Sequence, residues 1–334
     1  IRNGKYVIAP PHTALIPKDN GEFRTVYINE PVDRVFLSIA NDLLFELMPE
    51  MIHSKCQSYQ KGIGCGKIVK EISRKICETK GEIIGWKSDF SKYFDSVPIQ
   101  FIDDAFDKVE AKWGHSSIID VLRLDERLSQ LNGEYVRYSD DALFVGPDHE
   151  IAMQIMEEEV SKRDMELNPK KIEFLTHTRW FKFLGYSIKG ADISLSQTRI
   201  KAFQKEIESR TLRFKGATLS KAMYLVNQYL YRGNGEYSWA TSILPVVNVD
   251  KDIQTLGVFV MDCLRAVVTG KTKVGGLGYV ATQSDGCIQR GIGKNVKANR
   301  AKTDKMFPGF FTLGCMQKAL RTSKEAYKTL ISTM

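Results

Sequence analysis

The sequence lacks several features that would place it in a class at once. Its 334 residues include only six cysteines, and no two of them form a Cys-x-x-Cys pair. This spacing indicates neither a zinc site nor a disulfide framework. Scattered thiols are typical of a reducing compartment, so we expect a cytoplasmic protein. No apolar run is long enough to cross a bilayer, and we expect no membrane partner.

Acidic residues are scarce in the C-terminal part. Residues 264–334 carry 13 Lys or Arg against three acids, whereas the whole chain has a net charge of +8. A basic segment on a near-neutral body suits a protein that binds a polyanion, although basic surfaces also serve solubility alone. Several of these cations lie in a glycine-containing stretch and would suit a structured RNA or a template–primer duplex. They are Arg290, Lys294, Lys297, Arg300, Lys302 and Lys305.

Hydrophobic periodicity predicts an α+β fold, with strands and helices mixed up to about residue 190 and mostly helices afterwards. Residues 13–18 and 22–28 are β-rich runs around an Asn-Gly turn, which is a strong hairpin signal. Ser196 is a plausible helix N-cap. Further strands are expected at 82–89, within 134–145 and within 181–188. Further helices are expected at 32–48, 67–77, 98–113, 150–165 and 196–215.

Two neighbouring carboxylates, Asp140 and Asp141, lie between two β-prone apolar runs in the sequence Tyr-Ser-Asp-Asp of residues 138–141. A hairpin would present both at its tip, beside a buried sheet. Desolvation and mutual repulsion disfavour two acids there unless a cation binds them. Mg²⁺, which prefers oxygen ligands, is the natural cation. On the dipeptide alone, a solvated turn is the commoner interpretation.

Asp89 changes that balance, because it ends the predicted strand 82–89. Phosphoryl transfer by two metal ions needs carboxylates from separate strands, with the attacking and leaving oxygens in line. Asp89, Asp140 and Asp141 supply such a set.

These segments together resemble the motifs of bacterial reverse transcriptases, namely the group II intron, diversity-generating, retron and defence-associated enzymes. Asp89 with residues 93–96 resembles the first catalytic motif, and residues 138–141 resemble the Tyr-x-Asp-Asp motif, in which Tyr138 contacts the nucleotide. Four shorter segments follow the family order: 16–24 (fingers hairpin), 59–66 (second fingers motif), 167–171 (pyrophosphate lysine) and 183–186 (primer grip). Six motifs in one order are far more specific than any one of them.

The resemblance covers about residues 13–190 and implies a right-hand polymerase. Its parts would be fingers (1–85), a palm with an antiparallel sheet (86–190), a helical thumb (191–263) and a basic C-terminal extension (264–334). It implies two Mg²⁺ ions, or Mn²⁺, on the three aspartates. Lys18 and Arg24 would hold the triphosphate, and Lys171, with Lys170 as a rival, would protonate the leaving group. Gly185, Tyr186 and Arg199 would contact nucleic acid, with the C-terminal cations.

Phe94 favours DNA synthesis. The resemblance implies that an aromatic side chain five residues after the catalytic Asp excludes a ribose 2′-hydroxyl, whereas RNA polymerases usually have an Asp there. The expected activity is therefore an RNA-directed DNA polymerase that uses dNTPs, an RNA template or non-coding RNA, and a DNA product strand, in antiviral defence. A template-independent or protein-primed DNA polymerase and a non-catalytic RNA-binding scaffold remain alternatives. Oligomerisation is open.

One family motif is missing. Full reverse transcriptases carry a Gln-Gly…Ser-Pro-like segment, which packs the template, between the two aspartate motifs. The 43 positions from Asp95 to Tyr138 hold no Gln-Gly pair. Our hypothesis is that tens of residues of a full enzyme are absent near Arg123–Leu124.

Overall fold

The structure is a computed structural model that divides into two compact units. The first unit is Ile1–Ser54 with Ile99–Arg123, and the second is Lys55–Pro98 with Leu124–Met334. The described residues are 6–17, 21–47, 53–58, 60, 62–90, 100, 123–162, 165–213, 218–233, 238–269, 279–282, 288–291 and 313–332. The expected helix 98–113 lies outside them, apart from residue 100.

The described part of the first unit contains a β-hairpin and a helix. β1 (His12–Pro17) pairs antiparallel with β2 (Phe23–Ile28). The two predicted strands are therefore confirmed, while Lys18 lies outside the described residues. α1 (Pro31–Leu47) follows as expected. Asp33 in its first turn is buried and accepts hydrogen bonds from the Tyr6 hydroxyl and the Ala9 amide.

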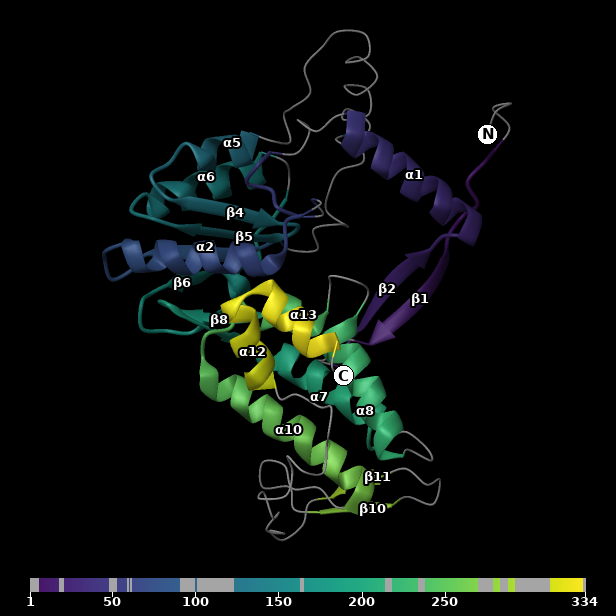
Figure 1. Ribbon diagram of the computed structural model, residues 1–334. Helices are drawn as coiled ribbons and strands as arrows, with labels where there is room; N and C mark the ends of the chain where they lie inside the picture. The colour runs from purple at the N-terminus through teal and green to yellow at the C-terminus, as the bar shows by residue number, and fades with distance from the viewer. Residues whose placement is uncertain are drawn as a thin grey trace. The chain divides into compact units, whose positions relative to one another are not determined.

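The second unit contains a four-stranded antiparallel sheet (Figure 1). Its strand order is β4 (Glu134–Tyr138), β5 (Asp141–Val145), β3 (Gly85–Asp89) and β6 (Glu173–Leu175). β4 and β5 are the hairpin expected within 134–145. Gly85 allows β3 to approach β5, because a Cβ there would lie 2.1 Å from the Phe144 carbonyl oxygen.

Helices cover both faces of this sheet, which explains why β5 is apolar at consecutive positions. Alternate residues of a strand point to opposite faces. Phe144 packs with residues of two helices on one face, and Leu143 packs with a third helix on the other (Figure 1). The helices are α5 (Arg123–Ser129) and α6 (His149–Ser161) on the first face and α2 (Cys65–Glu78) on the second.

A second, three-stranded antiparallel sheet follows in the chain. Its strands are β7 (Phe181–Phe183), β8 (Tyr186–Lys189) and β9 (Asp192–Leu195). The β7–β8 turn consists of Leu184 and Gly185, with φ values of 50° and 78°. Positive φ at both central residues is typical of a two-residue type I′ hairpin, so the strand pair expected within 181–188 is confirmed.

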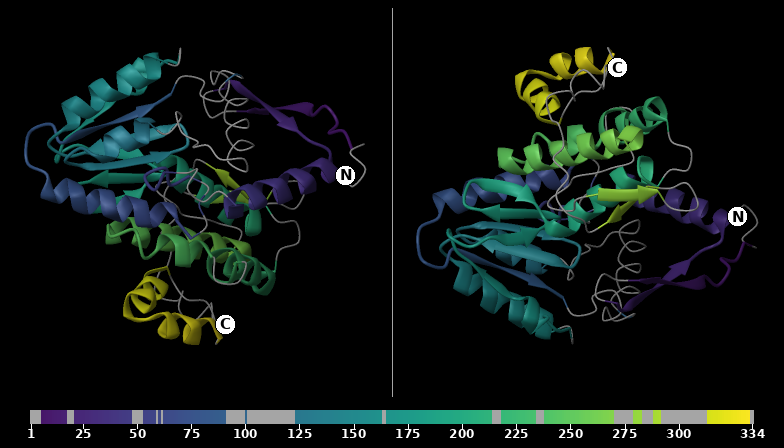
Figure 2. Two further views of the ribbon diagram at one scale, coloured as in Figure 1. Left: turned by 90° about the horizontal axis from the view of Figure 1, so that it is seen from above. Right: turned by 90° about the horizontal axis from the view of Figure 1, so that it is seen from below.

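The remaining elements are mostly helical, as expected. Ser196 caps α7 (Gln197–Arg210), since its Oγ accepts a hydrogen bond from the Arg199 amide at 3.3 Å. α12 packs against α9 and α10. Figure 2 shows α12 and α13, in yellow, side by side next to the green helices. The other elements are α8 (Leu219–Asn227), the π-helix η3 (Gln228–Arg232), α9 (Trp239–Ile243), α10 (Asp250–Thr269), β10 (Tyr279–Thr282), β11 (Ile288–Gly291), α12 (Leu313–Thr322) and α13 (Lys324–Ser332).

The protein therefore mixes helices with antiparallel sheets, as the α+β prediction requires. The assignment of fingers, palm and thumb stays a prediction. In the part of the chain that the structure describes, no helix combines the length and the apolarity that a membrane span requires.

Candidate active site

Two of the three predicted aspartates face each other across neighbouring strands. Asp89 is the last residue of β3, Asp141 is the first residue of β5, and the register makes them direct partners. Directly opposed residues project to the same face of a sheet, with Cβ atoms roughly 4.5–5.5 Å apart. Asp140 precedes Asp141 in the turn, and its carbonyl oxygen accepts a hydrogen bond from the Phe90 amide at 3.4 Å. The carboxylates distant in sequence thus meet at one edge of the sheet.

A lysine lies against this pair. The Lys171 Nζ is 2.7 Å from the Asp89 Oδ2. Lys171 ends the short 3₁₀ helix η2 (Pro169–Lys171), which is held near the site because the Asn168 amide donates to the Asp89 carbonyl oxygen at 3.1 Å. Of the two rival lysines, Lys171 is therefore the one that contacts an aspartate in this structure.

The surroundings disfavour a negative charge on Asp141. Burial, and then the charges of Asp140 and Asp89, raise the pKa of Asp141 to about 6, while Lys87 and Lys171 oppose the rise. Ionising this carboxylate at neutral pH thus costs folding free energy, and a bound cation would offset that cost.

Asp141→Asn is expected to stabilise the fold at neutral pH. Because the folded-state pKa of about 6 exceeds the ordinary 3.8, the penalty is absent below about pH 4, grows between about pH 4 and 6, and is complete above pH 6. Partial exposure of the carboxylate reduces the gain at pH 7 to about 1–2 kcal/mol. Urea unfolding of the wild type and of Asp141→Asn at pH 4 and pH 7 measures this gain in the free energy of unfolding. An equal gain at the two pH values would contradict the raised pKa of Asp141.

The carboxylate chemistry fits a divalent cation, although the ligand set is not assembled. The Asp89 Oδ1 is buried and has no hydrogen-bond partner, and such an atom favours a positive charge nearby. Among the described residues, however, no three Asp, Glu, His or Cys side chains are gathered so that they could hold a metal ion. In this structure the Lys171 ammonium is the cation on Asp89. A divalent ion on Asp89 Oδ2 would have to displace it.

The turn that carries the aspartates is held by a distant segment. Ser139 has a φ of 58°, a left-handed backbone conformation that is unfavourable for residues other than glycine. Its amide donates to the Ser58 Oγ at 3.1 Å, and Ser58 is buried. The chain just before Ser58 pairs with β4, because the Gln57 amide donates to the Arg137 carbonyl oxygen at 2.8 Å. Sequence reasoning missed Ser58, since no local pattern marks a hydrogen bond across 81 positions.

Ser58→Ala is expected to lower kcat for the proposed nucleotide transfer by about 10- to 100-fold with little change in KM. Loss of the acceptor lets Ser139 relax and moves Asp140 and Asp141, and displacements of about 1 Å have effects of this size. Steady-state kinetics on the purified variant measure kcat and KM separately. Ser139→Gly adopts the left-handed backbone freely, so adding it to Ser58→Ala should restore part of kcat. Unchanged kcat in Ser58→Ala would rule out this positioning role.

Asp125, also unforeseen from sequence, anchors β4 from α5. Its buried carboxylate accepts from the Arg137 Nε at 2.9 Å and Nη2 at 2.6 Å, and from the Tyr135 hydroxyl at 2.9 Å. A bidentate pair of this kind orients the two side chains as well as stabilising their contact. It holds the strand that leads into the aspartate turn.

The predicted nucleic-acid residues Gly185, Tyr186 and Arg199 come together. The Arg199 guanidinium lies over the Tyr186 ring, 4.5 Å from its centroid. A Cβ on Gly185 would lie 2.9 Å from that guanidinium, so glycine leaves the space that Arg199 occupies. Arg199 Nη1 is buried without a hydrogen-bond partner, which suits an acceptor or anion on a ligand.

Of the other predicted residues, Tyr138 lies beside the aspartates, and the rest are not placed relative to this site. Tyr138 ends β4 beside the aspartates, as Asp141 is its cross-strand partner. Arg24 is an exposed residue of β2 in the first unit. Only the backbone of Arg290, in β11, is described. The residues that lie outside the described part are Lys18, Phe94, Lys294, Lys297 and Arg300.

No family model and no curated protein matches this chain. Among solved structures, it is similar to telomerase from Candida albicans in complex with a fragment of telomeric RNA, at 10% identity and a TM-score of 0.41, over 78% of this chain and 59% of that one. It is also similar to the foamy viral protease–reverse transcriptase in complex with double-stranded DNA, at 13% identity and a TM-score of 0.36, over 99% and 69% of the two chains. This chain thus spans about 59% of the telomerase chain's length.

Proposed function

We propose that the protein is an RNA-directed DNA polymerase that adds dNTPs to a primer 3′-hydroxyl by metal-dependent phosphoryl transfer. The observation that carries this proposal is the direct cross-strand pairing of Asp89 with Asp141, with Asp140 in the adjoining turn. Two strands thereby present carboxylates at one edge of a buried sheet, as two-metal phosphoryl transfer requires.

Asp89, Asp140 and Asp141 would hold Mg²⁺ or Mn²⁺. When bound, the two ions lower the pKa of the primer hydroxyl and neutralise charge on the triphosphate. The unpartnered Asp89 Oδ1 and the crowded Asp141 carboxylate support this role. Their shared place at the ends of β3 and β5 fixes their spacing through backbone hydrogen bonds rather than through flexible loops.

Lys171 would have two successive roles. Before substrate binds, its ammonium neutralises Asp89, at 2.7 Å. Once released from Asp89, the ammonium would donate a proton to the leaving pyrophosphate. Lys18 and Arg24 would contact the triphosphate, with Arg24 suited to bidentate binding. Phe94 would crowd a 2′-hydroxyl and leave it without a hydrogen-bond partner, so deoxynucleotides would be preferred.

The proposed partners are an RNA template or dedicated non-coding RNA, the DNA product strand and dNTPs. Gly185, Tyr186 and Arg199, together with the C-terminal cations, would contact nucleic acid, so binding should weaken steeply with salt. A role in antiviral defence is part of this proposal, as is a cytoplasmic location.

A primer-extension assay tests the activity. Purified protein is given an RNA template, a DNA primer, Mg²⁺ and either dNTPs or NTPs. Template-dependent incorporation of dNTPs, with much weaker use of NTPs, supports the proposal. Efficient NTP use would indicate an RNA polymerase, and extension without template would indicate a template-independent enzyme. Nucleic-acid binding without any incorporation would indicate a scaffold.

A further inference from the structure

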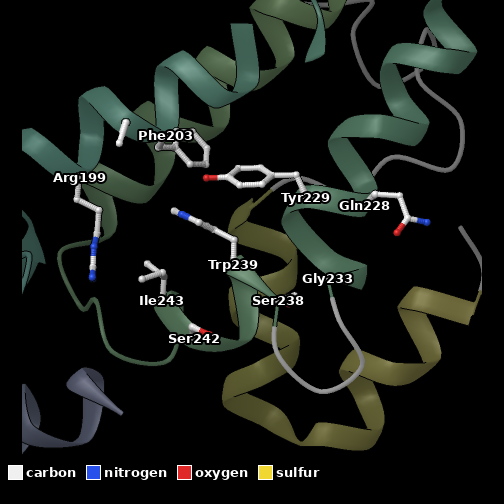
Figure 3. Close-up of a pocket in the computed structure, with 10 residues that line it drawn as sticks. Arg199, Phe203, Gln228, Tyr229, Gly233, Ser238, Trp239, Ser242 and Ile243 are labelled. Atoms are coloured by element: carbon white, nitrogen blue, oxygen red, sulfur yellow. The ribbon is translucent and has the colours of Figure 1, made fainter. Parts of the chain in front are cut away.

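A cavity of about 540 Å³ lies among α7, η3 and α9 (Figure 3). The elements that line it follow the three aspartates in the chain. Its volume is within the roughly 300–1,000 Å³ range of ligand sites. Its lining residues are Arg199, Ala202, Phe203, Gln228, Tyr229, Gly233, Ser238, Trp239, Ser242 and Ile243. Neither the sequence motifs nor the proposed chemistry uses this cavity as such.

Three aromatic side chains from three elements form one wall. The Phe203 ring, buried on α7, lies 4.6 Å from the Trp239 ring and 6.3 Å from the Tyr229 ring, between centroids. The Arg210 guanidinium lies over the Tyr229 ring at 4.5 Å and limits its movement. Phe203 is buried and tilted against both neighbours, so it holds the Tyr229 and Trp239 rings in place before any ligand arrives. The half-buried rings of Tyr229 and Trp239 are the ones on which a base can stack.

Arg199 gives the same cavity a positive end. Figure 3 shows its side chain extending from α7 on the side of Ile243 and Ser242. Stacking on Tyr186 fixes the guanidinium, yet its Nη1 is buried with no hydrogen-bond partner. A buried charged donor without an acceptor is costly. A phosphate or a ring acceptor in the cavity would bind the part of the Arg199 side chain that lines it and would partly offset that cost.

We propose that this aromatic cavity binds a single nucleotide, with the base against the wall of Phe203, Tyr229 and Trp239 and a phosphate or base acceptor on Arg199. Base–aromatic stacking tolerates every base, so little base preference is expected. The nucleotide could be free or could be an unpaired nucleotide of an RNA strand. The exposed Lys201 and Lys205, one turn apart on α7, would attract the backbone of such a strand.

The proposal rests on the proposed nucleic-acid role for the ligand's identity, but its test needs no catalysis. The probes are the monophosphate of 2-aminopurine riboside and a single-stranded RNA containing one 2-aminopurine, whose fluorescence falls on stacking. The exposed Ser242 lines the cavity, so Ser242→Trp would fill it without removing a buried contact. Ser220→Trp, at an exposed site of α8 outside the lining, is the matched control. Circular dichroism checks the fold, and Ala202→Trp replaces Ser242→Trp if that variant unfolds.

Quenching of either probe, weakened about tenfold or more by Ser242→Trp and unchanged by Ser220→Trp, is the expected result. The monophosphate arm identifies a free nucleotide, and quenching of the RNA alone identifies an unpaired nucleotide of a strand. The catalytically inactive Asp140→Ala/Asp141→Ala protein should bind as the wild type does, which separates this proposal from the polymerase proposal. Absence of quenching with both probes, or equal affinity in the filled variants, would overturn it.

Discussion

Replacing both Asp140 and Asp141 with alanine is expected to lower nucleotide incorporation by at least about 10³-fold. Stabilisation of transition-state charge by bound metal ions contributes several kcal/mol, and each 1.4 kcal/mol corresponds to about tenfold in rate. The two carboxylates lie at the turn between β4 and β5, beside Asp89, and no other described acid shares that edge as a cross-strand partner. Primer extension on an RNA template, followed with labelled dNTPs, measures the loss.

The double variant should remain folded, because it removes a repulsive cluster rather than a packing contact. The high pKa of Asp141 already indicates that its charge opposes folding. Asp192→Ala is the matched control, since Asp192 is an exposed acid on β9. It should keep the wild-type rate. If the double variant incorporated dNTPs as fast as the control, the polymerase proposal would fail.

Asp125→Ala is expected to destabilise the second unit by about 3–5 kcal/mol. The change leaves the Arg137 guanidinium, whose side chain is 14% exposed, without its bidentate partner and takes the acceptor from the Tyr135 hydroxyl. Removing one partner of a buried ion pair has costs of this size. Urea denaturation followed by circular dichroism gives the difference in the free energy of unfolding.

A variant that removes both partners distinguishes the loss of the ion pair itself from the cost of leaving the Arg137 charge buried and unpaired. In Asp125→Leu/Arg137→Met no buried charge remains, and apolar replacements of buried pairs are often tolerated. Its loss of stability should therefore be clearly smaller than that of Asp125→Ala. A loss in Asp125→Ala of less than about 1 kcal/mol, the range of an exposed ion pair, would show that the pair is not buried as the structure has it.

The strands that carry the aspartates could be predicted because their signals are local. Alternating or continuous apolar residues around 82–89 and 134–145 indicate strands, and Asp89 ends the first of them as expected. Asp141 was expected in the hairpin turn with Asp140, whereas the structure has it as the first residue of β5. The family resemblance implied a lysine, Lys171 or its rival Lys170, near the leaving pyrophosphate, and the contact of Lys171 with Asp89 was not foreseen. The helix ends were less accurate: α6 ends at Ser161 rather than 165, and α7 at Arg210 rather than 215.

The contacts that hold the site could not be predicted, because they join residues far apart in sequence. Ser58 reaches Ser139 across 81 positions, and Asp125 reaches Arg137 from a different element. A serine and an aspartate at such places look like ordinary turn or helix-surface residues until the fold brings them to a partner. The cavity lined by Trp239 could not be predicted either, because core packing is the usual role of an aromatic residue on a helix.

Asp89 and Asp141, from separate strands, should bind the same divalent cation. Titration of the protein with Mn²⁺, followed by electron paramagnetic resonance of the free ion, measures this without substrate. Asp89→Asn and Asp141→Asn should each weaken binding by more than about tenfold, while Asp192→Asn should not change it. Wild-type Mn²⁺ affinity in Asp89→Asn, or in Asp141→Asn, would show that the two strands do not share a metal site.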